Sequence, residues 1–108
     1  MSAKVAVVIP LYNVSKHLRQ CLDSVIAQSL RDLQIILVND GSEDSSLEIA
    51  QEYARNDSRI EVVDKANGGA GSARNEGFKR VKAEFVYFCD GDDWLDLQLL
   101  EKFYTLLK

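Results

Sequence analysis

The chain has 108 residues and is 46% hydrophobic, which is enough for one domain with a single core. Lys and Arg number 13 against 17 Asp and Glu, so the formal net charge is −4 at pH 7. Without a basic stripe or run, this balance excludes nucleic acid or an anionic membrane as the expected main partner. The apolar run near the N-terminus, of about six residues, is too short for a signal peptide or a membrane span.

The apolar pattern switches between strand-like runs and helix-like stripes four times along the chain. Runs of β-branched and aromatic residues predict buried strands at residues 5–9, 35–38, 60–63 and 85–89. Apolar residues at helical spacing within residues 18–26, 47–54, 70–81 and 95–107 predict four helices. Ser15 is the expected N-cap of the first helix, and Ser45 with Glu48 has the spacing of a capping box before the second.

Strands that alternate with helices predict an α/β fold with a Rossmann-like, mainly parallel sheet and helices on both faces. In such sheets, ligands bind outside the carboxyl ends of the strands. Polar residues gather at those ends, in residues 10–13, 39–42, 64–69 and 90–93. The opposite edge has generic connectors, such as residues 29–32 and 56–59. This asymmetry predicts one ligand site along one edge of the sheet.

The last of these clusters is the acidic turn, Asp90-Gly91-Asp92-Asp93. Carboxylates at alternating positions repel one another unless a cation lies between them. Mg²⁺ and Mn²⁺ prefer oxygen ligands and suit a diphosphate, so Asp90 and Asp92 are candidate metal ligands. A solvated loop is the alternative, and Asp93 could instead cap the last helix. We expect Trp94 to pack beneath the turn.

Several familiar phosphate sites do not fit this chain. The first strand-to-helix turn lacks the glycines of a dinucleotide fingerprint, and residues 69–74 end in Arg74 where the last glycine belongs. No GK[ST] sequence is present, which excludes a P-loop, and neither acidic segment fits a calcium loop. A phosphate ligand would therefore be held through a metal ion and side chains.

Five segments in order resemble the inverting family 2 glycosyltransferases. They are VIPLYN at 8–13, LDSVIAQS at 22–29, VNDGSED at 38–44, NGGAGSARNEG at 67–77 and YFCDGDDW at 87–94. The resemblance covers nearly the whole chain. It implies a GT-A fold, in which residues 1–108 form the N-terminal, nucleotide-sugar-binding half and the acceptor-binding part is absent.

For the nucleotide base of the donor, the resemblance implies that Pro10, Leu11 and Tyr12 line its pocket and that Tyr12 stacks on it. It implies that Asp40 accepts a hydrogen bond, which suits the N3–H of uracil and makes a UDP-sugar the expected donor. Each residue also has a plainer interpretation. Tyr12 could pack where the helix begins, and Asp40 with Ser42 could simply form the turn before the second helix.

At the diphosphate, the resemblance implies that Arg74 lies near the phosphates or the base and that Asp90 approaches the ribose and the metal. Asp92 is the expected ligand of Mg²⁺ or Mn²⁺. A metal there stabilises the charge that develops on a leaving nucleoside diphosphate without a proton transfer. A solvated charge on a helix face is the ordinary alternative for Arg74.

Inversion also needs a general base, and no carboxylate after the acidic turn is a convincing one. In this family the base follows in a further segment, so we expect it beyond Lys108, together with the pocket for a glycan or lipid-linked acceptor. The chain alone is then inactive, and a non-catalytic nucleotide-binding module stays open. A phosphatase of the haloacid dehalogenase type, with Asp90 as nucleophile and Asp92 as acid, is disfavoured because that family carries its aspartates on the first strand.

Two further expectations concern the surroundings of the protein. Cys21 and Cys89 form no CxxC motif and lie in apolar patterns, so reduced core thiols in a cytoplasmic protein are expected. The full-length protein could also lie at the inner face of the membrane. The last ten residues hold six large apolar side chains, more than one helix face buries, which predicts self-association through the C-terminal helix.

Overall fold

A computed structural model describes residues 2–108 and contains four strands and four helices in alternation. In chain order they are β1 (Ala3–Leu11), α1 (Ser15–Ile26), β2 (Leu33–Asp40), α2 (Ser46–Asn56), β3 (Ile60–Lys65), α3 (Ala70–Phe78), β4 (Ala83–Phe88) and α4 (Leu99–Leu107). The predicted α/β architecture is confirmed. No helix among residues 2–108 has the length and apolar character to cross a membrane.

The strands form one fully parallel sheet in the order β3-β2-β1-β4. The chain runs outward from β1 through β2 to β3 and then returns to place β4 on the other side of β1. Such a reversal in strand order is where open α/β sheets bind ligands. The register sets Leu11 opposite Asn39 and Asp40 opposite Lys65, so the polar strand ends lie at one edge.

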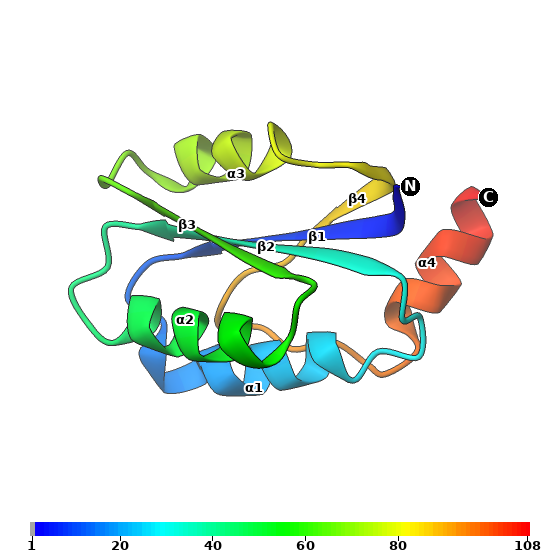
Figure 1. Ribbon diagram of the computed structural model, residues 1–108, viewed down its shortest axis with the longest axis horizontal. Coiled ribbons are helices and arrows are strands. Elements are labelled where there is room, and N and C mark those ends of the chain that lie inside the picture. Colours follow the sequence, from blue (N-terminus) through cyan, green and yellow to red (C-terminus); the bar gives the residue numbers. More distant parts are fainter. Residues whose placement is uncertain (1) are drawn as a thin grey trace.

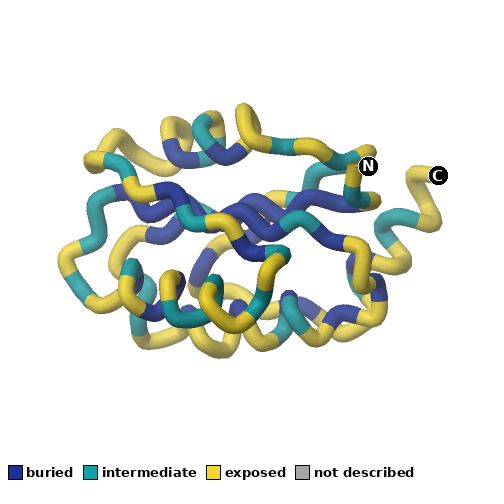
Figure 2. Tube along the Cα trace, viewed as in Figure 1, coloured by how far each residue is buried: buried dark blue, intermediate teal, exposed yellow. Residues whose placement is uncertain are grey.

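Side chains that alternate along the buried strands divide between two cores. Val7 and Ile9 pack in the core that contains the apolar side chains of α1 and α2, whereas Val8 packs with Ala73 of α3. Figure 1 shows α3 on one face of the sheet and α1 with α2 on the other, and Figure 2 shows the buried strands between them. Helices therefore cover both faces, as predicted.

The last helix, α4, packs beside β4 through aromatic contacts. Phe103 meets Tyr87 edge-on with ring centroids 5.3 Å apart, and Tyr104 meets Phe85 in the same way at 5.8 Å. Leu106 at the end of the helix stays exposed. Part of the apolar surface of α4 is thus buried within the chain, and self-association through the remainder stays a prediction.

Both predicted N-caps are wrong in detail. Ser15 is the first residue of α1 rather than its cap, and Ser45 makes no side-chain cap hydrogen bond, so no capping box forms with Glu48. Ser45 has ψ 17°, outside the extended conformation that turns a cap side chain toward the helix. Asp44 replaces both caps, since its carboxylate accepts the N–H groups of Ser15 at 3.1 Å and Ser46 at 2.9 Å.

Two helix boundaries also differ from the sequence prediction. α3 ends at Phe78 and not at residue 81, and α4 begins at Leu99 and not at residue 95. Leu95 instead belongs to the irregular segment that crosses α1, where its side chain is buried and its N–H donates to Ser24 Oγ at 3.0 Å. Leu95 fits the apolar periodicity because its own side chain is buried, not because this segment is helical, and Leu97 nearby is exposed.

Gly77 is predicted to be needed for the close approach of α3 to the sheet. A Cβ at this position would lie 2.4 Å from Val8 Cγ1 and 3.2 Å from Val38 Cγ2. We expect Gly77→Ala to lower the free energy of unfolding by about 1–3 kcal/mol through overpacking. Gly71→Ala on the same helix meets nothing within 4 Å and should be neutral or stabilising. Urea unfolding of both variants checks this, and equal stabilities would contradict the packing argument.

The free energy of unfolding is predicted to depend on pH through Asp44. Burial raises the pKa of Asp44, but hydrogen bonds from Ser46 and Ser15 outweigh it and lower the pKa to about 2. The ionised carboxylate therefore stabilises the fold above the ordinary pKa of an aspartate, and this contribution is lost as the pH falls toward 2. Asp44→Asn should cost about 1 kcal/mol at pH 7 and progressively less between about pH 4 and pH 2. Thermal unfolding across this range measures the difference, and a constant gap would refute it.

Candidate functional site

A cavity of about 460 Å³ lies where the carboxyl ends of the strands meet the start of α3. It contains six of the residues singled out from the sequence: Pro10, Leu11, Tyr12, Asp40, Asp90 and Asp92. These come from segments up to 82 positions apart in the chain, at the carboxyl ends of β1 and β2 and after β4. The polar strand ends therefore build one concave site, as the topology predicts.

Arg74 is the one candidate that does not line this cavity. It lies on α3, and its guanidinium Nη2 is 3.6 Å from Asp90 Oδ1. Both side chains are well exposed, so this ion pair contributes about 0–1 kcal/mol at most. A pair this weak leaves both groups free to exchange partners when an anion or a cation arrives.

Six further residues line the cavity and were not among the sequence candidates: Val14, Asn67, Gly69, Ala70, Ala73 and Gly91. Asn67 and Gly69 belong to the polar cluster after β3, so their position at a strand end was a usable signal. Ala70 and Ala73 are one helical turn apart, and small residues at that spacing mark the face of α3 that a ligand could approach. Small residues carry no charged or aromatic group, so the sequence alone does not single them out as candidates.

The loop that carries Tyr12 is tied to the loop that follows Asp40. The N–H of Asn13 donates to Ser42 Oγ at 3.1 Å, and the N–H of Val14 donates to Ser46 Oγ at 3.0 Å. Asn13 has φ 53°, a left-handed conformation that asparagine tolerates better than most residues. These bonds hold Tyr12 at the cavity with half of its surface exposed, so its ring is available to a ligand.

The glycine of the acidic turn brings the turn against the end of β1. A Cβ on Gly91 would lie 2.9 Å from Val14 Cγ2 and 3.0 Å from Leu11 Cδ2. Only a residue without a side chain fits this contact unless its neighbours move. The packing of Gly91 thereby positions Asp90 and Asp92 at the cavity wall, where both side chains remain exposed.

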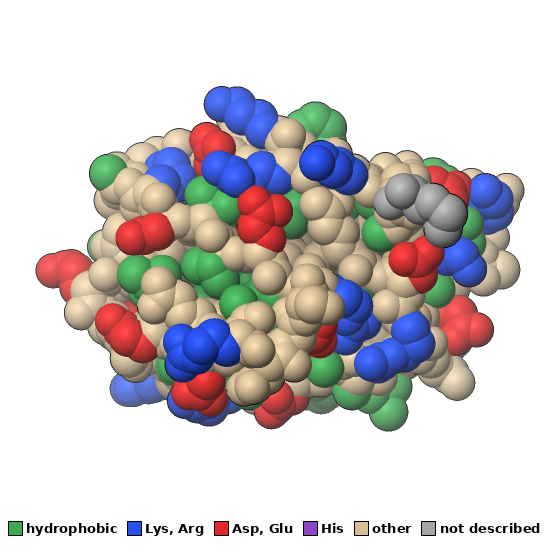
Figure 3. All heavy atoms as spheres, viewed as in Figure 1, with side chains coloured by type: hydrophobic (Ala, Val, Ile, Leu, Met, Phe, Trp, Pro, Cys, Tyr) green, Lys and Arg blue, Asp and Glu red, His purple; other side chains and the backbone are tan. Residues whose placement is uncertain are grey.

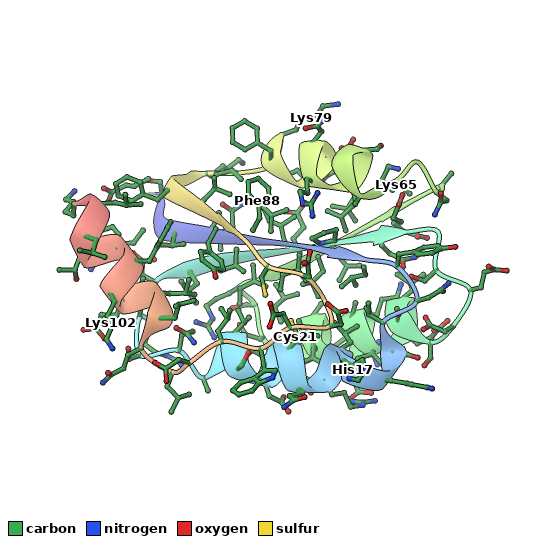
Figure 4. The ribbon with its side chains drawn as sticks, turned by 180° about the vertical axis from the view of Figure 1, so that it is seen from behind. His17, Cys21, Lys65, Lys79, Phe88 and Lys102 are labelled. Carbon is green, nitrogen blue, oxygen red and sulfur yellow. The ribbon has the colours of Figure 1, made fainter. Side chains whose placement is uncertain are left out.

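Two thiols fill the space beneath the acidic turn. Cys21 and Cys89 are buried and free, with their sulfur atoms 4.0 Å apart. Both thiols lie within 3.6 Å of the backbone oxygen of Asp90. Trp94, which we expected in this place, is 61% exposed, so that expectation is wrong. The small Cys pair sits between α1 and β4, where Figure 4 labels Cys21 beneath the sheet.

Asp40 differs from the other carboxylates of the cavity in being almost completely buried. Its oxygens accept hydrogen bonds from Lys65 Nζ at 3.0 Å and from the N–H groups of Gly68 at 2.9 Å and Gly69 at 3.0 Å. Burial raises the pKa of Asp40, but the Gly68 N–H, the Lys65 ammonium and the Gly69 N–H together hold it below the ordinary value. Asp40 is therefore a fixed negative charge in the cavity wall.

The donor set of the acidic turn fits a cation that also binds phosphate. Asp90 and Asp92 supply carboxylate oxygens, the ligand type that Mg²⁺ and Mn²⁺ prefer. Within residues 2–108, no cluster of three or more His, Cys, Asp or Glu side chains could hold a metal by itself. Magnesium is commonly bound through one or two carboxylates plus substrate phosphates, which is the number available here.

Comparison with known proteins gives a consistent match. Residues 6–108 match the family described as Glycosyl transferase family 2. The chain is 45% identical over 98 residues to the uncharacterized glycosyltransferase EpsJ of Bacillus subtilis (strain 168), covering 91% of this chain and 28% of EpsJ.

Two crystal structures of S. aureus TarS, residues 1–349, are also similar. The complex with UDP has a TM-score of 0.87 and 31% identity, covering 96% of this chain and 32% of that one. The complex with UDP-GlcNAc has the same TM-score and identity, covering 96% of this chain and 31% of that one. The predicted GT-A fold is confirmed. The chain spans under a third of each of these relatives.

Proposed function

This chain belongs to glycosyl transferase family 2, and on that premise we propose that its cavity binds a nucleotide sugar whose base is uracil. The observation that carries the proposal is that one cavity joins Tyr12 and Asp40 to Asp90 and Asp92. An aromatic ring with a buried acceptor suits a base, and an exposed carboxylate pair suits a metal-bound diphosphate. The TarS relative, which holds UDP in its crystal structure, supports the same ligand class.

In this proposal, the base lies against Pro10 and Leu11 and stacks on the half-exposed ring of Tyr12. Asp40 accepts the N3–H of uracil. Its Oδ1 already accepts two hydrogen bonds, whereas Oδ2 accepts only that of Gly69 among residues 2–108. A carboxylate oxygen has capacity for a second donor, so Oδ2 is the acceptor that we assign to the base.

At the other end of the cavity, Asp92 and Asp90 would hold Mn²⁺ or Mg²⁺ together with the diphosphate. The metal supplies stabilisation of the negative charge on the leaving nucleoside diphosphate. Arg74 leaves its weak pair with Asp90 and turns toward the phosphates. A cation held by Asp90 and Asp92 would relieve the repulsion between the two carboxylates, and its remaining positions would be open to phosphate oxygens.

For the parent protein, we propose transfer of the sugar with inversion to a glycan or lipid-linked acceptor. The donor-binding part lies in residues 1–108, and the general base with the acceptor pocket is proposed to lie in the part of the relatives that this chain does not span. We further propose that the enzyme acts in the cytoplasm or at the inner face of the membrane. Family membership sets aside the phosphatase alternative. Sugar transfer by the parent would distinguish an enzyme from a non-catalytic nucleotide-binding module.

Donor binding is predicted to require a divalent metal through Asp92. UDP titrated calorimetrically should bind with Mn²⁺ or Mg²⁺ and lose roughly 1.5–3 kcal/mol in Asp92→Asn, which removes the charge and keeps the shape. Asp32→Asn makes the same charge change at the opposite edge of the sheet and should leave binding unchanged. Equal affinity with and without a chelator would reject the metal assignment.

Base selection is predicted to depend on Asp40. An ionised carboxylate accepts from the N3–H of uracil but faces an acceptor nitrogen in cytosine. UDP should therefore bind more tightly than CDP, and Asp40→Ala should reduce that difference. Competition binding of UDP, CDP and GDP to both proteins measures it, and a preference for GDP would show that the assigned donor is wrong.

A further inference from the structure

Lys65 is a charged residue that lies behind the cavity wall, next to Asp40. It is the register partner of Asp40 on the neighbouring strand β3, so both side chains stand on the same face of the sheet. Its ammonium donates to Asp40 Oδ1 at 3.0 Å and to the backbone oxygen of Ala66 at 2.7 Å. Figure 4 shows Lys65 at the edge of the sheet where the loop leads into α3.

This contact is largely closed to solvent. The side chain of Lys65 is 20% exposed and that of Asp40 only 4%. The loop also closes over the ammonium, because a Cβ on Gly68 would lie 2.9 Å from Lys65 Nζ. An ion pair held in this way is neither screened nor mobile in the manner of a surface pair. Its geometry is therefore a fixed part of the cavity wall.

The two carboxylate oxygens of Asp40 have different hydrogen-bond partners. Among residues 2–108, Oδ1 accepts hydrogen bonds from Lys65 Nζ and the N–H of Gly68, whereas Oδ2 accepts one only from the N–H of Gly69. Lys65 does not itself line the cavity. We infer that Lys65 is a positioning residue for base selection, which occupies Oδ1 of Asp40 and so presents Oδ2 to the N–H of the bound base. This inference rests on the proposed function.

A second consequence of the pair concerns the charge of Asp40. A buried carboxylate without a cation beside it tends to bind a proton, and a protonated Asp40 would donate where the uracil N3–H also donates. Lys65 and the two glycine N–H groups oppose this, since they lower the pKa of Asp40 against the effect of burial. The other charged groups at the cavity are Asp90 and Asp92, with Arg74 beside Asp90.

The experiment compares the wild type with Lys65→Met, which keeps the length of the side chain and removes its charge. Calorimetric affinities for UDP and CDP with Mn²⁺ are measured from pH 5 to pH 8. In Lys65→Met, we expect UDP affinity at pH 7.5 to fall about tenfold and the ratio of UDP to CDP affinity to fall with it. The pH below which UDP binding is lost should move upward, because the pKa of Asp40 rises.

Two further variants make the result specific. Lys79→Met removes an exposed lysine at the end of α3, outside the cavity, and should keep the wild-type profile. Gly68→Ala keeps all charges but pushes into the ammonium of Lys65, so it should lower the UDP to CDP ratio in the same direction. It also provides the test if Lys65→Met does not fold.

The outcomes separate the two proposals. A wild-type protein that binds no UDP would overturn the proposed function and this inference with it. UDP binding by the wild type, with an unchanged base ratio and pH profile in Lys65→Met, would overturn the inference alone. A lower melting temperature without those changes would show that Lys65 is merely structural.

Discussion

Strand β1 is paired with a parallel strand on each side, and its residues 5–9 have no exposed surface. Unpaired polar groups cannot stand there, because each would cost several kcal/mol in a water-free environment. Polar groups that could bind a ligand are therefore confined to the carboxyl end of β1. Its pairing with β4 stops at Val8, whereas its pairing with β2 continues to Leu11. This difference in length leaves a notch on one side of β1, and the acidic turn occupies it.

The cavity brings together two kinds of carboxylate with opposite properties. Asp40 is buried, and its pKa is lowered. Both of its oxygens accept hydrogen bonds, so the orientation of its carboxylate is fixed. Asp90 and Asp92 stand exposed on a turn and can adjust to what they bind. A rigid acceptor suits recognition of a planar base, whereas adaptable oxygens suit a metal whose other ligands come from a flexible diphosphate. In the proposed function, similar side chains thus take different roles because their burial and their hydrogen-bond partners differ.

The strands, their parallel order and the edge that holds the site could be predicted because they follow from buried apolar runs and from the rule that ligands bind at strand ends. The helix caps could not, since Asp44 reaches both helix starts only after they are packed together. The position of Trp94 could not be predicted for a similar reason, because Cys21 and Cys89 fill the space beneath the turn only once α1 and β4 are packed together. The pairing of Lys65 with Asp40 depends on how β2 and β3 align in the folded sheet, because these residues are 25 positions apart in the chain.

Strand β4 lies at the edge of the sheet, so its backbone is hydrogen-bonded to a strand on one side only. Local opening of such a strand breaks fewer bonds than opening of β1 or β2. Amide hydrogen exchange should accordingly be slowest in the two central strands and faster in β4. The two halves of the cavity would then differ in how often they open. The half next to β4, which carries Asp90 and Asp92, would open more often than the half formed by the ends of β1 and β2.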